Sequence, residues 1–354
     1  MTYQVTIEPL GETIDVEEGQ SILDAALRAG IWIPYACNHG LCGTCKIDVL
    51  EGEINHQHAS PFALMDIERD ENKTLACCAT LESDIVIEVE LDEEPDAEQH
   101  AIADITATVS KTEMLTPTIR GIWLDVEGQG LAFQAGQYLN LTMPGIDQPR
   151  AFSIASSPSQ ANNIELNIRI VDGGAATRYL HNGVEVGDKL TFTAPLGRFF
   201  VRKSAPEPII FCAGGSGLSS PKSMILDLLE AGDTREITLI YGARTRQELY
   251  YVELFEGIAE QHSNFTYVPV LSDEPASSDW HRARGYVHEL ANDYFNGRFT
   301  GHKAYLCGPP PMIDACISTL MQGRLFEEHI FMESFLTAAD GAQPARRSAL
   351  FKKF

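Results

Sequence analysis

The sequence predicts a multidomain fold: an antiparallel β-barrel followed by an α/β domain with a parallel sheet, with a smaller cysteine-rich domain before both. Three observations support this prediction. At 354 residues the chain is long enough for two or three cores. Five of its eight cysteines lie between positions 37 and 78. The strand pattern changes twice, near residue 100 and again near residue 205.

The first domain is expected over residues 1–92. It contains alternating segments typical of strands, with one helix between them, at 3–10, 12–19, 21–30 (the helix) and 85–92. The segment after it, 93–100, is charged and contains a proline, which indicates a linker.

The second domain is expected over residues 101–204. Short alternating strands broken by Gly and Pro are typical of an antiparallel barrel. The expected strands are 104–114, 118–126, 137–143, 164–171 and 188–195.

The third domain is expected over residues 205–336, where apolar strands alternate with helices. Continuous apolar strands between helices indicate a parallel sheet covered on both faces. The expected strand and helix pairs are 208–215 with 221–232, 236–244 with 248–262, and 303–310 with 311–323. The remaining tail, 337–354, is basic and rich in small residues.

The charge is strongly acidic and unevenly distributed. The formal net charge is −24, and residues 1–100 hold 22 Asp and Glu against 4 Lys and Arg, a net of −18. Such a surface repels nucleic acid and anionic lipid, and it could steer a basic protein partner. No apolar run is long enough for a membrane span, and the acidic N-terminus does not resemble a signal peptide. We therefore expect a cytoplasmic protein that binds neither membrane nor nucleic acid.

The clustered cysteines indicate a metal site. Cys37, Cys42 and Cys45 form the pattern C-x4-C-x2-C, and a fourth thiol follows about thirty residues later at Cys77 or Cys78. This is the plant-type [2Fe–2S] spacing. Glycines within the loop allow the backbone to wrap tightly, so that amide N–H groups can point at sulfur. A structural zinc site and an unmetallated cysteine cluster are the alternatives, but zinc sites more often use two short C-x2-4-C pairs.

Cys77 is the expected fourth ligand, because in LACCA it occupies the ligand position of the ferredoxin pattern L-x-C. Cys78 is then a small buried neighbour. A Rieske centre would need two histidine ligands, which four thiolates make unnecessary. The nearby histidines are therefore expected to be solvated: His39, His56 and His58.

The segment RAFSIA suggests a flavin site. Arg150 and Phe152 alternate onto one face of an expected strand, and Ser153 follows. An arginine can clamp a diphosphate, an aromatic ring can cover an isoalloxazine, and a hydroxyl can reach the flavin N5. About twenty residues later Gly173-Gly174 ends a strand and a helix begins near Thr177, which would give a second phosphate cradle.

The segment PIIFCAGGSGLSSPKSMI suggests a nicotinamide dinucleotide site. An apolar strand runs into Gly214, Gly215 and Gly217, and a helix with Pro221 in its first turn follows. Glycines let the chain approach a pyrophosphate, and a helix N-terminus favours negative charge. The pattern departs from G-x-G-x-x-G, so a glycine-rich turn without a ligand is the alternative. Cys307-Gly308-Pro309 ends a later strand, where Cys307 should lie near the reacting carbon.

NADH is favoured over NADPH. The expected strand FTYVPVL ends in Ser272-Asp273-Glu274, which is acidic where a clamp for the 2′-phosphate of NADPH would be sought. Arg244 and Arg246, after the preceding strand, are basic and keep NADPH as the alternative.

On these residues the chain resembles the oxygenase reductases of the ferredoxin–NADP reductase superfamily, over essentially its whole length. It is most similar to the reductase components of multicomponent phenol hydroxylases, and the methane and toluene monooxygenase reductases are close relatives. The motifs that show the resemblance are CNHGLCGTCK, SPFALMDIERDE, LACCA, RAFS, VDGGAAT, AGGSGLSSP and LCGPPPMI.

The resemblance implies a β-grasp [2Fe–2S] ferredoxin domain, a Greek-key barrel that binds FAD, and an α/β domain that binds NADH. It implies cluster ligands at Cys37, Cys42, Cys45 and Cys77. Flavin contacts are implied at Arg150, Phe152, Ser153, Arg169, Gly174 and Thr177, and dinucleotide contacts at Gly214, Gly215, Gly217, Cys307, Gly308 and Pro309.

The segment FMESF resembles the family's E-x-F beside the flavin, which nominates Glu333 and Phe335. The wider superfamily usually has Tyr where this chain has Phe152, a difference that removes a hydroxyl and keeps the stacking. Its NADP-dependent members carry Ser-Arg where this chain has Ser272-Asp273, which again favours NADH.

The chemistry orders the three cofactors. A nicotinamide gives two electrons as hydride and an iron–sulfur cluster carries one, while a flavin can do both. The expected function is transfer from NADH to FAD to [2Fe–2S] and on to the oxygenase (hydroxylase) component of a monooxygenase. The alternatives are a reductase for another oxygenase (toluene or methane monooxygenase, or a ring-hydroxylating dioxygenase), a redox sensor, and a zinc-binding interaction module.

Overall fold

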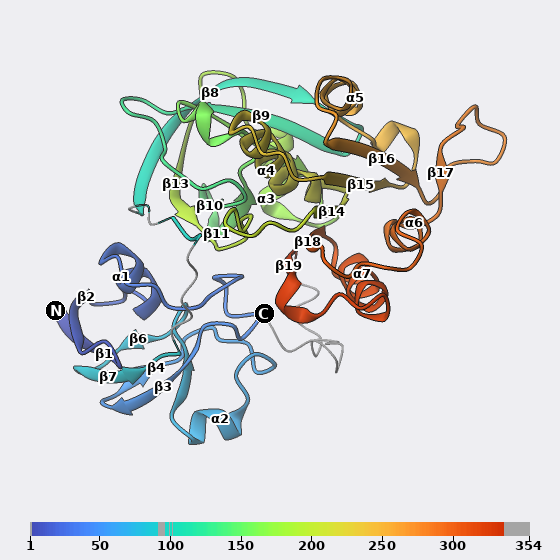
Figure 1. Ribbon diagram of the computed structural model, residues 1–354. Coiled ribbons are helices and arrows are strands. Elements are labelled where there is room, and N and C mark those ends of the chain that lie inside the picture. The colour runs from blue at the N-terminus through green and yellow to red at the C-terminus, as the bar shows by residue number, and fades with distance from the viewer. Residues whose placement is uncertain (1, 91–95, 99, 101, 336–354) are drawn as a thin grey trace. The chain divides into compact units, whose positions relative to one another are not determined.

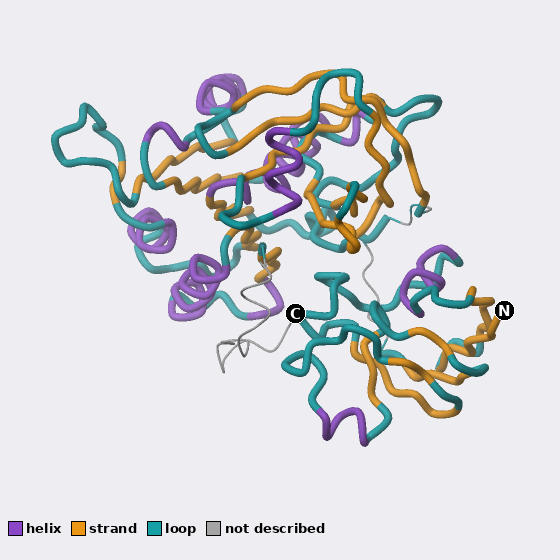
Figure 2. The backbone as a smooth tube through the Cα atoms, turned by 180° about the vertical axis from the view of Figure 1, so that it is seen from behind, coloured by secondary structure: helices purple, strands orange, loops and turns teal. Residues whose placement is uncertain are grey.

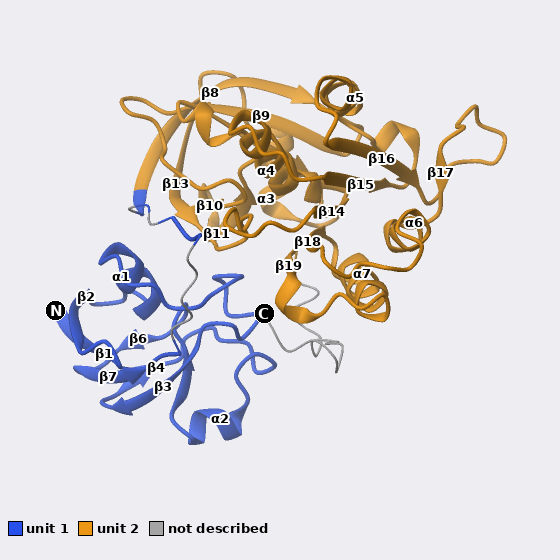
Figure 3. Ribbon diagram, viewed as in Figure 1, with its two compact units in different colours: residues 1–103, 336–346, 354 blue, residues 104–335, 347–353 orange. Residues whose placement is uncertain are grey.

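The computed structural model describes residues 2–90, 96–98, 100 and 102–335. The chain divides into two compact units, of which the first ends at Ala103 and the second begins at Asp104 (Figure 3). Half of the expected linker, residues 93–95 and 99, and the whole tail, 337–354, lie outside the described residues.

The first unit is built on a five-stranded mixed sheet with the order β2-β1-β7-β3-β5 (Figure 1). β1 pairs antiparallel with β2 and parallel with β7, and β3 is antiparallel to both of its neighbours. The strands are β1 (Thr2–Glu8), β2 (Glu12–Glu17), β3 (Lys46–Glu51), β5 (Lys73–Leu75) and β7 (Ile85–Glu88). The smaller elements are α1 (Ile22–Arg28), α2 (Asp66–Asp70), β4 (Ile54–Asn55) and β6 (Thr80–Leu81). Together with α1 this sheet forms the expected β-grasp domain.

Helix α1 forms where the sequence predicts it. The Ser21 hydroxyl caps it by accepting a hydrogen bond from the Asp24 amide, at 3.2 Å. Ile22, Leu23 and Ala26 are fully buried, so the apolar side of the helix contributes to the core of this unit.

The second unit begins with a six-stranded antiparallel sheet with the order β11-β10-β13-β8-β9-β12. A bridge between Ile154 and Leu166 joins the two edges, so the sheet curls into the expected barrel. Leu139, Leu141 and Ile168 are among the residues that fill its core. The strands are β8 (Ala103–Met114), β9 (Ile119–Asp125), β10 (Tyr138–Met143), β11 (Ile146–Ser153), β12 (Asn163–Arg169) and β13 (Lys189–Leu196), and the helix α3 (Ala175–Asn182) follows β12.

The rest of the unit is a parallel sheet with the order β17-β16-β15-β14-β18-β19. Residues of α4 and α5 pack in the core on one face, and residues of α6 and α7 pack on the other, as the layers in Figures 1 and 2 show. The strands are β14 (Ile209–Gly214), β15 (Ile237–Ala243), β16 (Phe265–Leu271), β17 (Ala283–Arg284), β18 (Lys303–Gly308) and β19 (Ile330–Ser334). The helices are α4 (Ser219–Glu230), α5 (Val252–Gln261), α6 (Val287–Tyr294) and α7 (Pro310–Gln322).

Two local features differ from the sequence expectation. The helix expected from residue 248 begins at Val252, because Tyr251 adopts a left-handed conformation with φ of 57° that interrupts it. A 3-10 turn, Gly215–Leu218, lies between β14 and α4. Among the described residues, no helix has both the length and the apolar character needed to cross a bilayer.

Candidate functional site

The cysteine loop wraps closely because two of its residues have no side chain. Gly40 and Gly43 have φ of +71° and +76°, a conformation that favours glycine. A Cβ atom on Gly40 would lie 2.5 Å from Cys78 Sγ, and one on Gly43 would lie 3.1 Å from the Ala63 carbonyl oxygen. Any other residue at Gly40 would push the loop away from the second cysteine segment.

Backbone amides point at the sulfur atoms. The His39 amide donates to Cys37 Sγ at 3.4 Å, and the Gly40 amide donates to the Cys77 sulfur. The Thr44 hydroxyl lies 3.2 Å from Cys42 Sγ. Such donors stabilise thiolates, so this loop is prepared to hold sulfur in its anionic form.

The four thiols fall into two pairs. Cys37 shares a hydrogen bond with Cys42, and Cys45 shares one with Cys77. The Cys37 contact lowers the pKa of Cys42 to about 5, while the same contact, with burial, raises the pKa of Cys37. Within the described residues, no group of three or more Cys, His, Asp or Glu side chains is arranged to hold a single metal ion. Two pairs suit a binuclear cluster, in which each iron takes two thiolates, better than one tetrahedral zinc.

Cys78 and the nearby histidines surround this loop. Cys78 Sγ lies 3.6 Å from Cys77 Sγ and 3.6 Å from His58 Nε2. Only His58 is exposed as expected; His39 and His56 are partly buried. His56 Nδ1 bonds the buried Thr74 hydroxyl at 2.9 Å, and burial lowers the pKa of His56. The expectation that all three histidines are solvated was therefore wrong for His39 and His56, which are partly buried.

In the second unit, one carboxylate oxygen collects donors from three separate elements. Ser153, the last residue of β11, donates to Glu333 Oε2 at 3.0 Å, and Ser220 in the first turn of α4 donates to the same oxygen at 2.7 Å. Cys307 Sγ lies 3.6 Å from it. Cys307 and Glu333 are register partners on the parallel strands β18 and β19. The structure thus brings together Ser153, Cys307 and Glu333, which the sequence nominated separately.

Burial dominates the electrostatics of this group. Burial raises the pKa of Glu333, although the hydrogen bonds from Ser220, Ser153 and Cys307 each act to lower it. Burial likewise raises the pKa of the Cys307 thiol, and the neighbouring Glu333 carboxylate raises it further. Cys307 is therefore a neutral thiol, and Glu333 can hold a proton at a higher pH than an exposed glutamate.

The other residues nominated for flavin include two on β11 and two at the turn that leads into α3. Phe152 is partly buried against the barrel core. Arg150 is exposed, and its guanidinium bonds only the carbonyls of Gln148 and Pro149 among described residues. The Thr177 hydroxyl accepts the Val171 amide at 3.0 Å, which closes the turn through Gly173-Gly174 before α3.

The glycine loop meets both the barrel and the strand that carries Cys307. A Cβ atom on Gly217 would lie 2.3 Å from the Cys307 carbonyl oxygen, so only glycine fits there. A Cβ atom on Gly215 would lie 3.2 Å from a guanidinium nitrogen of Arg169, which comes from β12 of the barrel. The Phe335 amide donates to the Gly308 carbonyl at 3.0 Å. Pro309 precedes α7, and Gly214 ends β14.

A buried ion pair between the barrel and α4 escaped the sequence analysis. Lys222, which is 4% exposed, donates to Glu165 Oε2 at 2.7 Å and to the Ala155 carbonyl at 3.0 Å. The Tyr251 hydroxyl donates to the other Glu165 oxygen at 2.5 Å. The available signal was a lysine next to Pro221 on an otherwise apolar helix face, and Ser220 beside it was missed in the same way.

The acidic segment after β16 lies beside both arginines. The Asp273 amide donates to the Arg244 carbonyl at 2.8 Å, and the Arg246 amide donates to a Glu274 oxygen at 2.8 Å. The Arg246 guanidinium is paired with Asp279 at 3.2 Å. The Arg246 guanidinium is thus paired with a carboxylate in place of a 2′-phosphate, which favours NADH.

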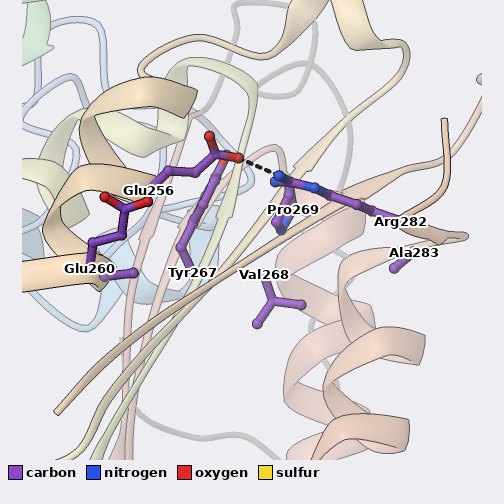
Figure 4. Close-up of a pocket in the computed structure, with 8 residues that line it drawn as sticks. Glu256, Glu260, Tyr267, Val268, Pro269, Arg282 and Ala283 are labelled. Carbon is purple, nitrogen blue, oxygen red and sulfur yellow. Dashed lines mark hydrogen bonds and ion pairs between the residues drawn. The ribbon is translucent and has the colours of Figure 1, made fainter. Parts of the chain in front are cut away.

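A separate open hollow of about 490 Å³ lies between α5 and the sheet edge formed by β16 and β17 (Figure 4). Tyr267 and Val268 line it, and an ion pair between Glu256 and Arg282 lies beside it. None of the residues nominated from the sequence lines this hollow.

Three protein-family models match the chain in the expected order. They are the 2Fe-2S iron-sulfur cluster binding domain over residues 5–82, the oxidoreductase FAD-binding domain over 106–201, and the oxidoreductase NAD-binding domain over 211–317.

Curated relatives extend the match to the full length. The chain is 58% identical to the phenol 2-monooxygenase reductase component DmpP of Pseudomonas sp. (strain CF600), over 100% of both chains. It is 58% identical to the phenol hydroxylase P5 protein of Acinetobacter pittii, over 99% of both chains. The chain belongs to the oxygenase reductases of the ferredoxin–NADP reductase superfamily.

Solved structures agree with this assignment. The cytochrome P450 reductase GcoB of Amycolatopsis matches this reductase with a TM-score of 0.88 and 34% identity, covering 94% of this chain and 99% of that one. The ferredoxin reductase of carbazole 1,9a-dioxygenase matches with a TM-score of 0.80 and 26% identity, over 95% and 99%. The reductase accordingly uses FAD, a [2Fe–2S] cluster and NADH, and electrons pass in the order NADH, FAD, cluster.

Proposed function

We propose that this reductase is the electron-supplying component of a cytoplasmic multicomponent phenol hydroxylase, and that it passes electrons to the oxygenase component of that system. The observation that carries the proposal is the 58% identity, over the full length, to two reductase components of phenol hydroxylases. The domain boundaries we propose are 1–92, 101–204 and 205–336, with 93–100 as linker.

The proposed cluster ligands are Cys37 with Cys42, and Cys45 with Cys77. The two pairs of thiols and the amides aimed at them support this set. When bound, the cluster supplies one-electron transfer, and the flavin supplies the exchange between hydride and single electrons. A metal in this loop displaces the thiol protons, so cluster binding releases protons.

The proposed flavin contacts are Arg150, Phe152, Ser153, Arg169, Gly174 and Thr177, and the proposed dinucleotide contacts are Gly214, Gly215, Gly217, Gly308 and Pro309. We propose that Ser153, Cys307, Glu333 and Phe335 surround the reacting atoms. The hydrogen bonds from Ser153 and Ser220 fix the Glu333 carboxylate. Glu333 Oε2 is then the atom that accepts or returns a proton at this buried position, through the Ser153 hydroxyl.

The surface of the first unit fits a basic partner. All four Lys and Arg side chains among the described residues of this unit are engaged: Arg28 with Asp24, Lys46 with Glu68, Lys73 with Asp48, and Arg69 with the Ala59 carbonyl. The remaining acidic side chains give an uncompensated negative surface. Three large apolar residues lie in the segment that follows the cysteine loop, Phe62, Met65 and Ile67, and are 51%, 52% and 63% exposed. An apolar centre with an acidic rim is a suitable docking surface for a basic protein.

The test is a reconstituted assay. Purified reductase should bleach when NADH is added without air, contain iron and sulfide in equal amounts, and release FAD on denaturation. With a purified phenol hydroxylase oxygenase component, it should support NADH oxidation that depends on phenol. The proposed partner is wrong if the reductase supports faster substrate-dependent NADH oxidation with the oxygenase component of propane or toluene monooxygenase than with that of phenol hydroxylase. The cofactor assignment would still stand.

A further inference from the structure

Asn167, on β12, has a buried side-chain amide that no group in the described chain satisfies. The residue is 6% exposed, and neither its Nδ2 nor its Oδ1 has a hydrogen-bond partner. A buried amide without partners is costly, and native proteins rarely leave both of its polar atoms unpaired. The position therefore calls for an occupant that the protein chain does not itself supply.

Asn167 lies on the face of β12 that meets the NAD-binding half of the unit. Leu166 and Ile168, its neighbours in sequence, point into the barrel core. Alternation places Asn167 on the opposite face, with Glu165 on one side and Arg169 on the other. Glu165 bonds Lys222 of α4, and Arg169 lies beside Gly215 of the glycine loop. The unpaired amide thus sits between two contacts to the dinucleotide-binding half.

The strand register also places Asn167 opposite Ser153. Ile154 bridges Leu166, and the Ala155 amide donates to the Glu165 carbonyl at 2.8 Å. In this antiparallel register Ser153 and Asn167 are the next cross-strand pair, with side chains on the same face. Ser153 donates to Glu333, so Asn167 adjoins the group that the proposed function places at the reacting atoms.

We propose that the Asn167 side chain binds the imide or carboxamide edge of the redox ligand held beside Ser153. A carboxamide offers one donor and one acceptor, which match an adjacent C=O and N–H. Two ligands of this reductase present that edge: the pyrimidine ring of the flavin and the carboxamide of the nicotinamide. This inference rests on the proposed placement of the flavin at Ser153, and it assigns to Asn167 a role in orienting the ring.

The test compares N167L with N264L, with and without FAD. Leucine has nearly the shape of asparagine but removes both polar atoms. Asn264 is the matched control, because its Nδ2 already donates to the carbonyls of Asp233 and Arg235, both at 2.9 Å. In protein freed of flavin, N167L should melt at or above the wild-type temperature, whereas N264L should melt below it. On addition of FAD, N167L should gain less in melting temperature than the wild type.

Two titrations identify which ligand Asn167 contacts. If it is the flavin, the FAD Kd of flavin-free N167L should rise about tenfold, because a ligand group would be left unpaired. If it is the nicotinamide, the FAD Kd should stay unchanged and the KM for NADH should rise by a similar factor in FAD-saturated protein. N167S, with a smaller side chain, provides the same measurements should N167L fold poorly.

Unchanged FAD Kd and NADH KM in both variants would overturn the inference and leave the proposed function standing. So would a fall in the melting temperature of flavin-free N167L as large as that of N264L, because Asn167 would then have partners within the chain. Failure of the flavin-free wild type to bind FAD at all would instead overturn the proposed function, and this inference with it.

Discussion

The cysteine loop and the Glu333 group both contain buried thiols, but their side chains come together in different ways. The loop holds four thiols, three of which come from nine consecutive residues. The Glu333 group joins Ser153, Ser220 and Cys307, which come from β11, α4 and β18. In the loop, hydrogen bonds from the neighbouring Cys37 and Thr44 lower the pKa of Cys42 although burial acts to raise it, whereas around Glu333 burial raises the pKa despite the hydrogen bonds. The comparison teaches that neighbouring residues can set the pKa of a thiol in the loop. Around Glu333, the packing of distant elements sets the pKa of both the carboxylate and the Cys307 thiol.

The largest effect is expected in the cysteine loop, where replacing each of two adjacent cysteines shows which one binds the cluster. C77S should lose the cluster, so iron and sulfide should fall to near zero and cytochrome c reduction should fall with them. C78S is the matched control and should keep its cluster, because Cys45 shares its hydrogen bond with Cys77. Reduction of ferricyanide by NADH, which needs only the flavin, should survive in both. Loss of iron from C78S alone would reverse the ligand assignment.

The next largest effect is expected where α4 packs on the barrel, when the buried ion pair between Lys222 and Glu165 is broken. K222M leaves the Glu165 carboxylate in the core with only the Tyr251 hydroxyl as partner. Breaking a buried pair in this way should cost about 3–5 kcal/mol of unfolding free energy, measured by urea denaturation. The control is K203M, which breaks the more exposed pair with Asp227 and should cost at most about 1 kcal/mol. Equal losses would mean that Lys222 does not hold α4 to the barrel.

The sequence predicts the cysteine loop more completely than the Glu333 group, because the loop depends on neighbouring residues and the group depends on distant ones. The cysteine spacing, the order of the three domains and the strands on either side of Gly214 follow from neighbouring residues. Ser153 and Cys307 could be nominated by motif, but nothing local indicates that both meet Glu333. Ser220, Lys222 and Glu165 were missed because their partners lie 57 to 113 residues away. The late start of α5 was missed because Tyr251 adopts a backbone conformation that its residue type does not suggest.

Replacement of the carboxylate tests whether packing really controls Glu333. Burial raises its pKa above the ordinary value of 4.5. The folded protein therefore binds this proton more tightly than the unfolded chain does. The resulting stabilisation is complete below pH 4.5 and is lost as pH rises through the raised pKa. E333Q removes this titration, so its stability relative to the wild type should improve as pH rises, in urea unfolding between pH 4.5 and 8. A constant difference across that range would contradict the raised pKa.

The smallest expected effect concerns a single hydrogen bond. The Ser220 hydroxyl lowers the pKa of Glu333, so S220A should raise it further and move the pH window above to higher pH. The lost bond should cost about 1 kcal/mol of unfolding free energy. If the same free energy is lost in the transition state at the reacting group, the reduction of the flavin by NADH, measured by stopped flow, should slow about fivefold. The control is S219A, because the Ser219 hydroxyl donates to the Ser216 carbonyl at 2.9 Å and not to Glu333. S219A should lose similar stability, but the pH range over which stability falls should stay that of the wild type. The reason is that Ser220, and not Ser219, donates a hydrogen bond from α4 to the Glu333 carboxylate.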